Sequence, residues 1–565
     1  MNRSIRIFFV LPALVCSSFI PFGGRYPVYA SQGMVVSSSM TASEIGRDVL
    51  KSGGNAIDAA VATAFALAVT YPGAGNIGGG GFMVYVPKSG EPTTIDFREK
   101  APLAATEKMF MDKNGKLIPQ SNLEGILAPG TPGTVAGLFL AHQRYGRLTW
   151  QQLLDPAVKL AANGFKITHA LQEDGKAFQY LWRKYPSTAK VLLKDGRPYM
   201  QGELWKQPDL ARTLKRISEK GHDGFYSGET AAQFAQFMKK NGGLITEQDL
   251  AQYHAVERKP LHGTYRGYEL YSMAPPSSGG VALIEMLNIL EGYDLSEVGY
   301  GSADYYTLLS EVMRRAFSDR AQFLGDPDFN KDIPLARLTS KEYASTQRRS
   351  IQFYKSSPSD STRFGQIYEG SNHTTHFSVV DKEGNAVAVT YTIENWFGSQ
   401  LVVDGLGFLL NNEMGDFNPV PGVTTSDGQI GTAPNLIAPG KRMLSSMTPT
   451  ILTKDGKPFL VIGAPGGRTI INTVLQVILN VVDHHMPVSR AIEEPRIHHQ
   501  WLPDVLLSER LEINKDTRAI LSSRGFRLGD LEWTGDAMGI LIDPKTNQLL
   551  GASDSRGEDA GAAGY

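Results

Sequence analysis

The sequence is nearly free of cysteine, because Cys16 is the only one among 565 residues. Cys16 lies in an apolar run that follows the basic start "MNRSIR" and precedes "VYA" at residues 28–30. This order is typical of a secretory signal peptide, which we predict over residues 1–30 with a cut after Ala30. A membrane anchor is disfavoured by the prolines in the run and by its shortness. The mature chain then has no thiol, which excludes disulfides, cysteine catalysis and cysteine-bound metal.

An excess of either charge sign is also missing. Lys plus Arg number 56 against 57 for Asp plus Glu, which gives no reason to expect a nucleic-acid or anionic-membrane partner. The Ala-rich residues 56–69 are too few for a membrane span and predict a core helix. With 42% hydrophobic residues the chain can bury a large core. We therefore predict an exported globular protein, periplasmic or secreted, without membrane contact once the signal is removed.

Common cofactor and metal motifs are absent or out of place. Residues 73–78, "GAGNIG", match a dinucleotide-binding glycine pattern, but here a helix precedes the glycines and a strand follows. That order is the reverse of what phosphate binding requires, so we predict tight backbone packing instead. The adjacent pairs His484–His485 and His498–His499 point in diverging directions, and no HExxH pattern occurs. We predict no metal and no cofactor.

Helical and strand-like patterns alternate along the chain. We expect a helix over "EIGRDVLKSGG", capped by Ser43 and ended by glycines 53 and 54, and mainly helices over residues 150–344. From His376 onward, two β-rich segments flank the turn "DKEGN", and a second pair flanks "KDGK". The apolar helix "RTIINTVLQVILNVV" follows that second pair. Helices on both sides of strand pairs predict a layered α/β fold.

The stretch "EGSNHTTHFSVV" at residues 369–380 raises the question of catalysis. Two hydroxyl groups stand at the start of a strand, yet the chain shows neither an obvious triad nor a Gly-x-Ser-x-Gly elbow. A cut before a threonine would supply the missing base, because the new α-amine can take the hydroxyl proton. An α-amine has a pKa of about 7.7–8.0 against about 10.4 for lysine, so only the amine is appreciably neutral at pH 7. From the residues alone, Thr374 and Thr375 remain equal candidates.

Motifs along the whole mature chain resemble the γ-glutamyltranspeptidase family of N-terminal-nucleophile hydrolases. They occur in family order: "AIDAAVATAFALAVTYPGAGNIGGGGFMVY", "IDFREKAP", "APPSSGG", "NHTTHFSVVDKEGNAVAVTYT", "LLNNEMGDF", "LSSMTPT", "GAPGG" and the closing "AGY". The resemblance implies a four-layer αββα sandwich, built from two chains that are cut from one precursor. It implies a cut between His373 and Thr374, giving a large subunit over residues 31–373 and a small subunit over residues 374–565.

The same resemblance implies the reaction. Thr374 matches the nucleophile, which would attack the His373 carbonyl in the precursor and the γ-amide of glutathione or another γ-glutamyl compound in the mature enzyme. Water or an amino-acid or dipeptide acceptor would then release the γ-glutamyl group. Thr392 matches the threonine that hydrogen-bonds the nucleophile. Gly466 and Gly467, between a strand and a helix, match the oxyanion hole, although "GAPGG" could be only a tight turn.

The substrate's zwitterionic end needs a carboxylate site and an ammonium site. Arg98 matches the family's carboxylate-binding arginine, and Ser445 and Ser446 match its hydroxyl partners. The alternatives are a surface ion pair for Arg98 and an ordinary strand start for the serines. Glu413 and Asp416 match the ammonium ligands, where the alternative is a solvated loop. Glu394 stands where several members have asparagine, so we expect stronger selection for a free α-amine.

Two departures from the family pattern bear on the pocket. Gln400 replaces a more usual glycine, which makes the shape of that turn uncertain from sequence. Residues 418–441 match a segment that lids the site in some members, but Asp427 falls near the place of the aromatic gate, so we expect a more open donor pocket. A glutaryl or cephalosporin acylase of the same fold is the nearest alternative function, and an exported binding protein that never cuts itself is a further one.

Overall fold

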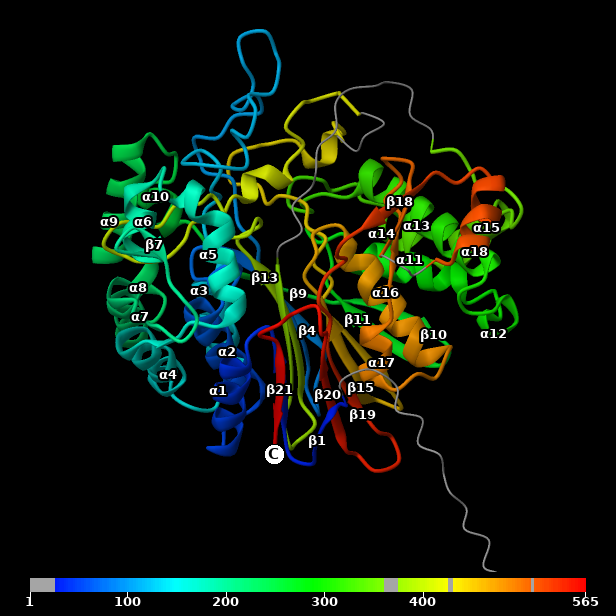
Figure 1. Ribbon diagram of the computed structural model, residues 1–565, viewed down its shortest axis with the longest axis horizontal. Coiled ribbons are helices and arrows are strands. Elements are labelled where there is room, and N and C mark those ends of the chain that lie inside the picture. The colour runs from blue at the N-terminus through cyan, green and yellow to red at the C-terminus, as the bar shows by residue number, and fades with distance from the viewer. Residues whose placement is uncertain (1–25, 360–373, 425–429, 510–512) are drawn as a thin grey trace, which may run out of the picture.

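Two seven-stranded antiparallel sheets lie face to face between two layers of helices (Figure 1). The computed structural model describes residues 26–359, 374–424, 430–509 and 513–565. One sheet has the order β1 (Val28–Ala30), β20 (Leu549–Ser553), β19 (Met538–Ile542), β15 (Lys457–Gly463), β14 (Thr450–Lys454), β11 (Tyr268–Ser272), β10 (Leu261–Tyr265). The other has the order β21 (Gly561–Gly564), β2 (Met34–Ser37), β12 (Thr375–Val380), β13 (Ala386–Thr392), β3 (Gly80–Val86), β4 (Thr93–Phe97), β9 (Val256–Arg258).

Each sheet carries its own helical layer, and small sheets lie outside the sandwich. The β12 sheet is covered by α1 (Met40–Lys51), α2 (Ala56–Thr70), α3 (Thr134–Tyr145), α4 (Trp150–Asn163), α5 (His169–Trp182), α6 (Pro186–Leu192), α7 (Pro208–Lys220), α8 (Asp223–Tyr226), α9 (Gly228–Asn241) and α10 (Glu247–Ala251). The β15 sheet is covered by α11 (Gly279–Leu290), α12 (Leu295–Val298), α13 (Ala303–Phe323), α14 (Leu335–Leu338), α15 (Lys341–Arg349), α16 (Thr469–Val482), α17 (Val488–Glu493) and α18 (Lys515–Ser523). The small sheets pair β5 (Phe165–Lys166) with β8 (Leu204–Trp205), β6 (Leu193–Lys194) with β7 (Arg197–Pro198), and β16 (Ile497–His498) with β17 (Leu506–Glu509) and β18 (Leu528–Leu531).

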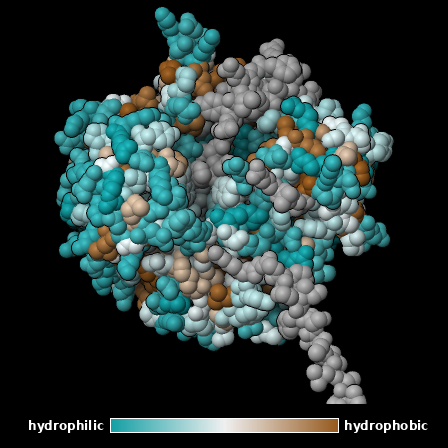
Figure 2. All heavy atoms as spheres, viewed as in Figure 1, coloured by the Kyte–Doolittle hydropathy of each residue, from teal (hydrophilic) through white to brown (hydrophobic). Residues whose placement is uncertain are grey.

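Three apolar clusters correspond to the three contacts between the four layers. The largest two lie between each sheet and its helices, and a smaller one between the sheets is lined by β-strand residues such as Val36, Ala388 and Val461. Because both faces of each sheet are covered, β12 and β13 are buried along their whole length, including polar residues such as His376 and Thr390. The αββα sandwich expected from the resemblance is confirmed. Figure 2 shows a mostly hydrophilic surface on the face that it views.

Most of the expected elements are present, and one cap is wrong. The hairpin β12–β13, the hairpin β14–β15 and helices α2 and α16 lie where the sequence predicts them. Helix α1, however, begins at Met40 with Ser39 as its N-cap residue. Ser43 lies inside the helix, and its hydroxyl donates to the Gly561 carbonyl at 2.8 Å. The sequence pattern could not show this contact, because β21 is more than 500 residues away.

The "GAGNIG" glycines pack closely against backbone, as expected. They connect α2 to β3, and a Cβ on Gly78 would lie 2.1 Å from the Leu409 carbonyl oxygen. A Cβ on Gly79, which directly follows the motif, would lie 2.0 Å from the Thr392 carbonyl oxygen. These glycines therefore let two chain segments approach beside the strand end that carries Thr392.

The N-terminal region bears on the predicted signal peptide. Residues 1–25 lie outside the described residues, while Val28–Ala30 forms β1 and pairs with β20. A cut after Ala30 would remove this edge strand, and the position of the cut stays a prediction. None of the helices in the described ranges is both long and apolar enough to cross a membrane.

Candidate active site

The two candidate threonines point to different environments. Thr374 directly precedes β12, is 5% exposed and lines a pocket at the end of the sheet. Thr375 is fully buried, and its hydroxyl lies 2.7 Å from the Ser38 hydroxyl. Neighbouring strand residues face opposite sides, so only one of the pair can face the pocket. His373 lies outside the described residues, so the predicted cut itself remains untested.

The end of β13 lies across from Thr374. Strand register pairs Thr375 with Tyr391, which brings residue 374 opposite Thr392, the last residue of β13. Directly opposed strand residues have Cβ atoms about 4.5–5.5 Å apart. Thr392 also lines the pocket, and its hydroxyl oxygen accepts a bond of 2.8 Å from the Glu394 amide. The hairpin therefore brings these two predicted site threonines together.

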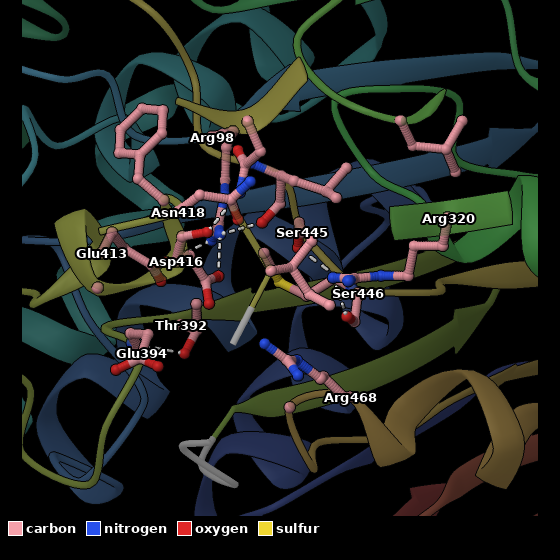
Figure 3. Close-up of a pocket in the computed structure, with 18 of the residues that line it drawn as sticks. Arg98, Arg320, Thr392, Glu394, Glu413, Asp416, Asn418, Ser445, Ser446 and Arg468 are labelled. Atoms are coloured by element: carbon pink, nitrogen blue, oxygen red, sulfur yellow. Dashed lines mark hydrogen bonds and ion pairs between the residues drawn. The ribbon is translucent and has the colours of Figure 1, made fainter. Parts of the chain in front are cut away.

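Acidic side chains gather around Arg98 at one end of the pocket (Figure 3). Arg98 follows β4, and Glu413 and Asp416 lie on a short 3-10 helix, η1 (Glu413–Asp416). An Arg98 Nη1–Glu413 Oε2 ion pair measures 2.7 Å, Arg98 Nη2 pairs with Asp416, and the Glu99 carboxylate is 3.5 Å from Nη1. Arg98 is only 1% exposed, so its interpretation as a surface ion pair is wrong.

This end of the pocket has more acidic side chains than basic ones. Burial raises the pKa of Glu99 to about 8, although Arg98 opposes the shift. Burial also raises the pKa of Glu413, again against Arg98, and the neighbouring carboxylates of Glu99, Asp416 and Glu394 add to the rise. The carboxyl groups of Glu99, Glu413 and Asp416 all contact this one guanidinium, so an added positive charge would stabilise their ionised forms.

Hydroxyl groups occupy the other end. The Ser445 oxygen accepts a bond of 3.1 Å from the Met447 amide, and Ser446 lies beside it in the pocket wall. The "APPSSGG" motif supports this segment, because the Ser277 hydroxyl donates to the Met447 carbonyl at 2.6 Å and the Ser278 hydroxyl donates to the Ser445 carbonyl at 2.6 Å. The role of that motif near the site could not be predicted from its sequence.

The glycine pair forms a loop with free donors beside the pocket. Gly466 and Gly467 connect β15 to α16 and have φ angles of +134° and +55°, which favour glycine. In the described part of the chain, neither backbone N–H donates to a protein acceptor. Gly467 lines the pocket, and the loop is tied down by the Thr469 hydroxyl, which donates to the Gly466 carbonyl at 2.8 Å. The loop can therefore accept an oxyanion at the start of α16.

The departures from the family pattern have structural counterparts. Gln400 adopts a φ of +68°, as glycine would, and its side-chain amide donates to the carbonyls of Trp396 at 2.8 Å and Gly398 at 3.3 Å. The Gln400 side chain therefore stabilises this turn, in which the Gln400 backbone adopts a strained left-handed conformation. Asp427 lies outside the described residues, so the openness of the lid stays a prediction. Described parts of the 418–441 segment do line the pocket.

Two arginines in the pocket wall were not predicted from the sequence. Arg320 reaches the pocket from α13, and Arg468 directly follows the glycine loop (Figure 3). Neither lies in a motif that marks a ligand by itself, so no local signal identifies them. The role of Asn411 was not predicted either. Its side-chain oxygen accepts a hydrogen bond of 3.0 Å from the Glu413 amide and so holds η1 in place.

His376 and the adjacent pair His498–His499 have separate structural partners. His376 is buried between the sheets, with Nδ1 2.8 Å from the Thr390 hydroxyl, and burial lowers the pKa of His376 to about 3. His498 lies 2.7 Å from the Asn472 amide, whereas His499 lies 3.2 Å from Asp504. The adjacent rings thus face different neighbours, as their spacing predicts.

The sandwich and a threonine at the start of a central strand define a hydrolase of the N-terminal-nucleophile class. Residues 42–564 match the sequence model of the family described as Gamma-glutamyltranspeptidase, and the chain belongs to that family. It is 48% identical over 543 residues to the glutathione hydrolase proenzyme of Escherichia coli strain K12, covering 96% of this chain and 93% of that one.

Acylases are more distant relatives. The acylase ACY 1 proenzyme of Pseudomonas sp. strain SE83 is 37% identical over 535 residues, covering 94% of this chain and 93% of that one. A crystal structure of cephalosporin acylase from Bacillus halodurans superposes with a TM-score of 0.84 at 28% identity, over 97% of this chain and 98% of that one. The chain is therefore an enzyme of the γ-glutamyltransferase type rather than a binding protein.

Proposed function

We propose that the chain cuts itself before Thr374 and then transfers γ-glutamyl groups from glutathione and related donors. In the precursor, the Thr374 hydroxyl oxygen attacks the carbonyl carbon of His373, and the peptide bond is exchanged for an ester. Water hydrolyses that ester, which leaves a carboxylate on His373 and a free α-amine on Thr374. The cut therefore produces the nucleophile's own base.

In the mature enzyme, the α-amine of Thr374 accepts the hydroxyl proton as the oxygen attacks the γ-amide carbon. Negative charge develops on the carbonyl oxygen, where the N–H groups of Gly466 and Gly467 stabilise it. The proton passes to the leaving amine, the C–N bond breaks, and a γ-glutamyl ester remains on Thr374. Water, an amino acid or a dipeptide then attacks this ester and restores the hydroxyl. Thr392, opposite the nucleophile, orients the Thr374 hydroxyl during both attacks.

The observation that carries the proposal is the division of charge across the pocket. Glu394, Glu413 and Asp416 lie at one end, and the hydroxyls of Ser445 and Ser446 lie at the other (Figure 3). A γ-glutamyl donor presents an ammonium and a carboxylate on one carbon, so it matches both ends at once. In the free site, Arg98 pairs with acidic side chains. When a donor binds, Arg98 would pair with the donor's carboxylate in place of one of these acids, and that acid would pair with the donor's ammonium.

The charge division also favours γ-glutamyl donors over those of an acylase. A glutaryl side chain lacks the ammonium, so it would leave the excess carboxylates of Glu394, Glu413 and Asp416 without an added cation. A buried excess of like charge is unfavourable unless a counter-ion is present. We therefore expect glutaryl amides to be poor donors.

We propose two associated subunits in an exported enzyme. Residues 31–373 and 374–565 each contribute strands to both large sheets, so separating them would expose both sheets. The signal peptide predicted over residues 1–30 would direct the precursor out of the cytoplasm. No nucleic acid and no cofactor is required by the proposed steps.

The test compares neighbouring threonines. Thr374→Ala should remain a single chain and release no aniline from a γ-glutamyl anilide, whereas Thr374→Ser should still be cut and retain measurable turnover. Thr375→Ala is the matched control, because its hydroxyl faces Ser38 rather than the pocket. The proposal fails if Thr374→Ala keeps wild-type activity or if the wild-type enzyme prefers a glutaryl anilide.

A further inference from the structure

Arg320 is a cation in the pocket wall that the proposed reaction does not use. It lies near the end of α13, is half-buried, and faces the serine end of the pocket (Figure 3). Desolvation, together with the positive charges of Arg468 and Arg98, lowers the pKa of Arg320 to about 9, while Asp416 opposes the shift. Even so, the guanidinium remains charged at neutral pH.

The contacts of Arg320 are with hydroxyl groups. Its Nε donates to the Ser278 oxygen at 2.8 Å, and its Nη2 donates to the Ser446 oxygen at 3.0 Å. Across the described ranges, no acidic side chain forms an ion pair with Arg320. Desolvated charges in proteins are usually paired, so this guanidinium can stabilise an anion that a ligand brings into the pocket.

The bond to Ser446 also decides what that hydroxyl can do. A serine hydroxyl has one hydrogen to donate and two lone pairs to accept with. Arg320 occupies a lone pair of Ser446, and the Met447 amide occupies one of Ser445. Neither hydroxyl donates to a protein acceptor among the described residues, so both hydrogens are available to the pocket.

Arg98 is already committed to protein groups in the free site. Besides its ion pairs with Glu413 and Asp416, its Nε donates to the Met443 carbonyl at 3.3 Å and its Nη2 to the Leu444 carbonyl at 3.4 Å. Its positive charge is therefore largely neutralised before a donor arrives. A donor carboxylate needs additional positive charge close to the two serines.

We propose that Arg320 is a positioning residue for the α-carboxylate of the donor. It orients the Ser446 hydroxyl so that its hydrogen points to that carboxylate, and its own charge stabilises the carboxylate beyond what Arg98 supplies. Ser278 holds the guanidinium in this orientation. The inference rests on the proposed function, because it assigns one end of the same donor to Arg320.

The test compares two anilides that differ only in the α-carboxylate. A γ-glutamyl anilide carries it, and a 4-aminobutanoyl anilide lacks it. Arg320→Gln should lower kcat/KM for the γ-glutamyl anilide by about 10–100-fold, chiefly through KM, because it removes charge-assisted hydrogen bonding. The same substitution should change kcat/KM for the 4-aminobutanoyl anilide less than about threefold. Arg320→Lys should recover part of the loss, because it keeps the charge.

A matched control comes from the same helix. Arg315→Gln removes an arginine of α13 that pairs with Glu311 at 2.7 Å outside the pocket, and it should leave the ratio between the two donors unchanged.

If Arg320→Gln fails to fold, Ser278→Ala provides the test, because it removes the bond to Arg320 Nε. Ser278→Ala also removes the bond to the Ser445 carbonyl, so it is compared with Ser277→Ala, which loosens the same segment at the Met447 carbonyl without contacting Arg320. Ser278→Ala should lower the same ratio by a smaller factor.

Two results separate the inference from the proposed function. If the wild-type enzyme cleaves neither anilide, the proposed function itself is wrong. If the wild-type enzyme is active but Arg320→Gln and Ser278→Ala lower both donors equally, only the inference is wrong, because a general structural defect would not depend on the carboxylate. Competition by free L-glutamate and 4-aminobutanoate gives the same comparison without turnover, should the second anilide react too slowly.

Discussion

Gly466→Ala would place a methyl group where the neighbouring atoms leave no room for it. A Cβ on Gly466 would lie 2.4 Å from the Thr469 hydroxyl and 2.8 Å from the Thr534 carbonyl oxygen. Thr469 cannot rotate away without losing its bonds to the carbonyls of Gly466 and Thr534. The loop must therefore move, and with it the N–H groups proposed to hold the oxyanion.

The size of the effect follows from these contacts. An L-residue at a φ of +134° is strained by about 1–3 kcal/mol. The contacts of 2.4 Å and 2.8 Å are also shorter than a Cβ atom tolerates, so the loop or its neighbours must shift. Loss of one oxyanion donor lowers kcat by about 10²–10³. We expect a fall of that size in kcat with KM changed by less than about threefold, because these donors act on charge that develops during the reaction.

The assay needs a control for strain alone. Gly456 lies in the β14–β15 turn with a φ of +74°, and a Cβ there would meet no atom within 4 Å. Gly456→Ala should therefore keep kcat within about twofold. Rates on a γ-glutamyl anilide are divided by the amount of cut chain, which is measured on a denaturing gel. A Gly466→Ala enzyme with wild-type kcat would refute the proposed oxyanion site.

Glu99, Glu394 and Gln400 carry the remaining predictions. Because burial raises the pKa of Glu99 to about 8 from an ordinary 4.5, its contribution to stability is fully present below pH 4.5 and is lost as the pH rises towards 8. Glu99→Gln should gain on the order of 2–4 kcal/mol relative to wild type over that range, and thermal midpoints that shift in parallel from pH 5 to pH 8 would contradict this. Glu394→Asn should lower the preference for γ-glutamyl over glutaryl anilides about tenfold in kcat/KM, since a charged acceptor becomes neutral; an unchanged ratio argues against ammonium contact. Gln400→Gly should change the free energy of unfolding by less than about 1 kcal/mol, because relief of backbone strain offsets two lost hydrogen bonds. Gln400→Ala keeps the strain and should be less stable by about 1–2 kcal/mol, so equal urea midpoints for these two variants would be inconsistent with the turn described.

Local patterns predicted the two hairpins whose ends line the pocket. β-rich segments on either side of the turns "DKEGN" and "KDGK" predict two hairpins, and each hairpin forms because its turn residues and its strands agree. The start of one strand and the loop after another then carry Thr374 and Gly466. The strand and the loop depend on neighbours in sequence and can be predicted locally, whereas the choice of Thr374 over Thr375 and the role of Gly466 came from the family resemblance.

Contacts between distant segments could not be predicted in the same way. Arg320 reaches Ser446 from 126 residues away, and nothing around either residue marks the other. Ser43 resembles a helix cap until β21 supplies a carbonyl for its hydroxyl. The pairing of Arg98 with Glu413 likewise depends on two loops meeting at the edge of a sheet. Such contacts are properties of the folded chain rather than of any motif.

The most direct test of the central claim is N-terminal sequencing of the smaller fragment of the purified enzyme. The proposed mechanism predicts a fragment that begins Thr-Thr-His-Phe at Thr374, absent from Thr374→Ala and present in Thr375→Ala. An active enzyme that stays in one piece, or a small fragment that begins at any other residue, would contradict it.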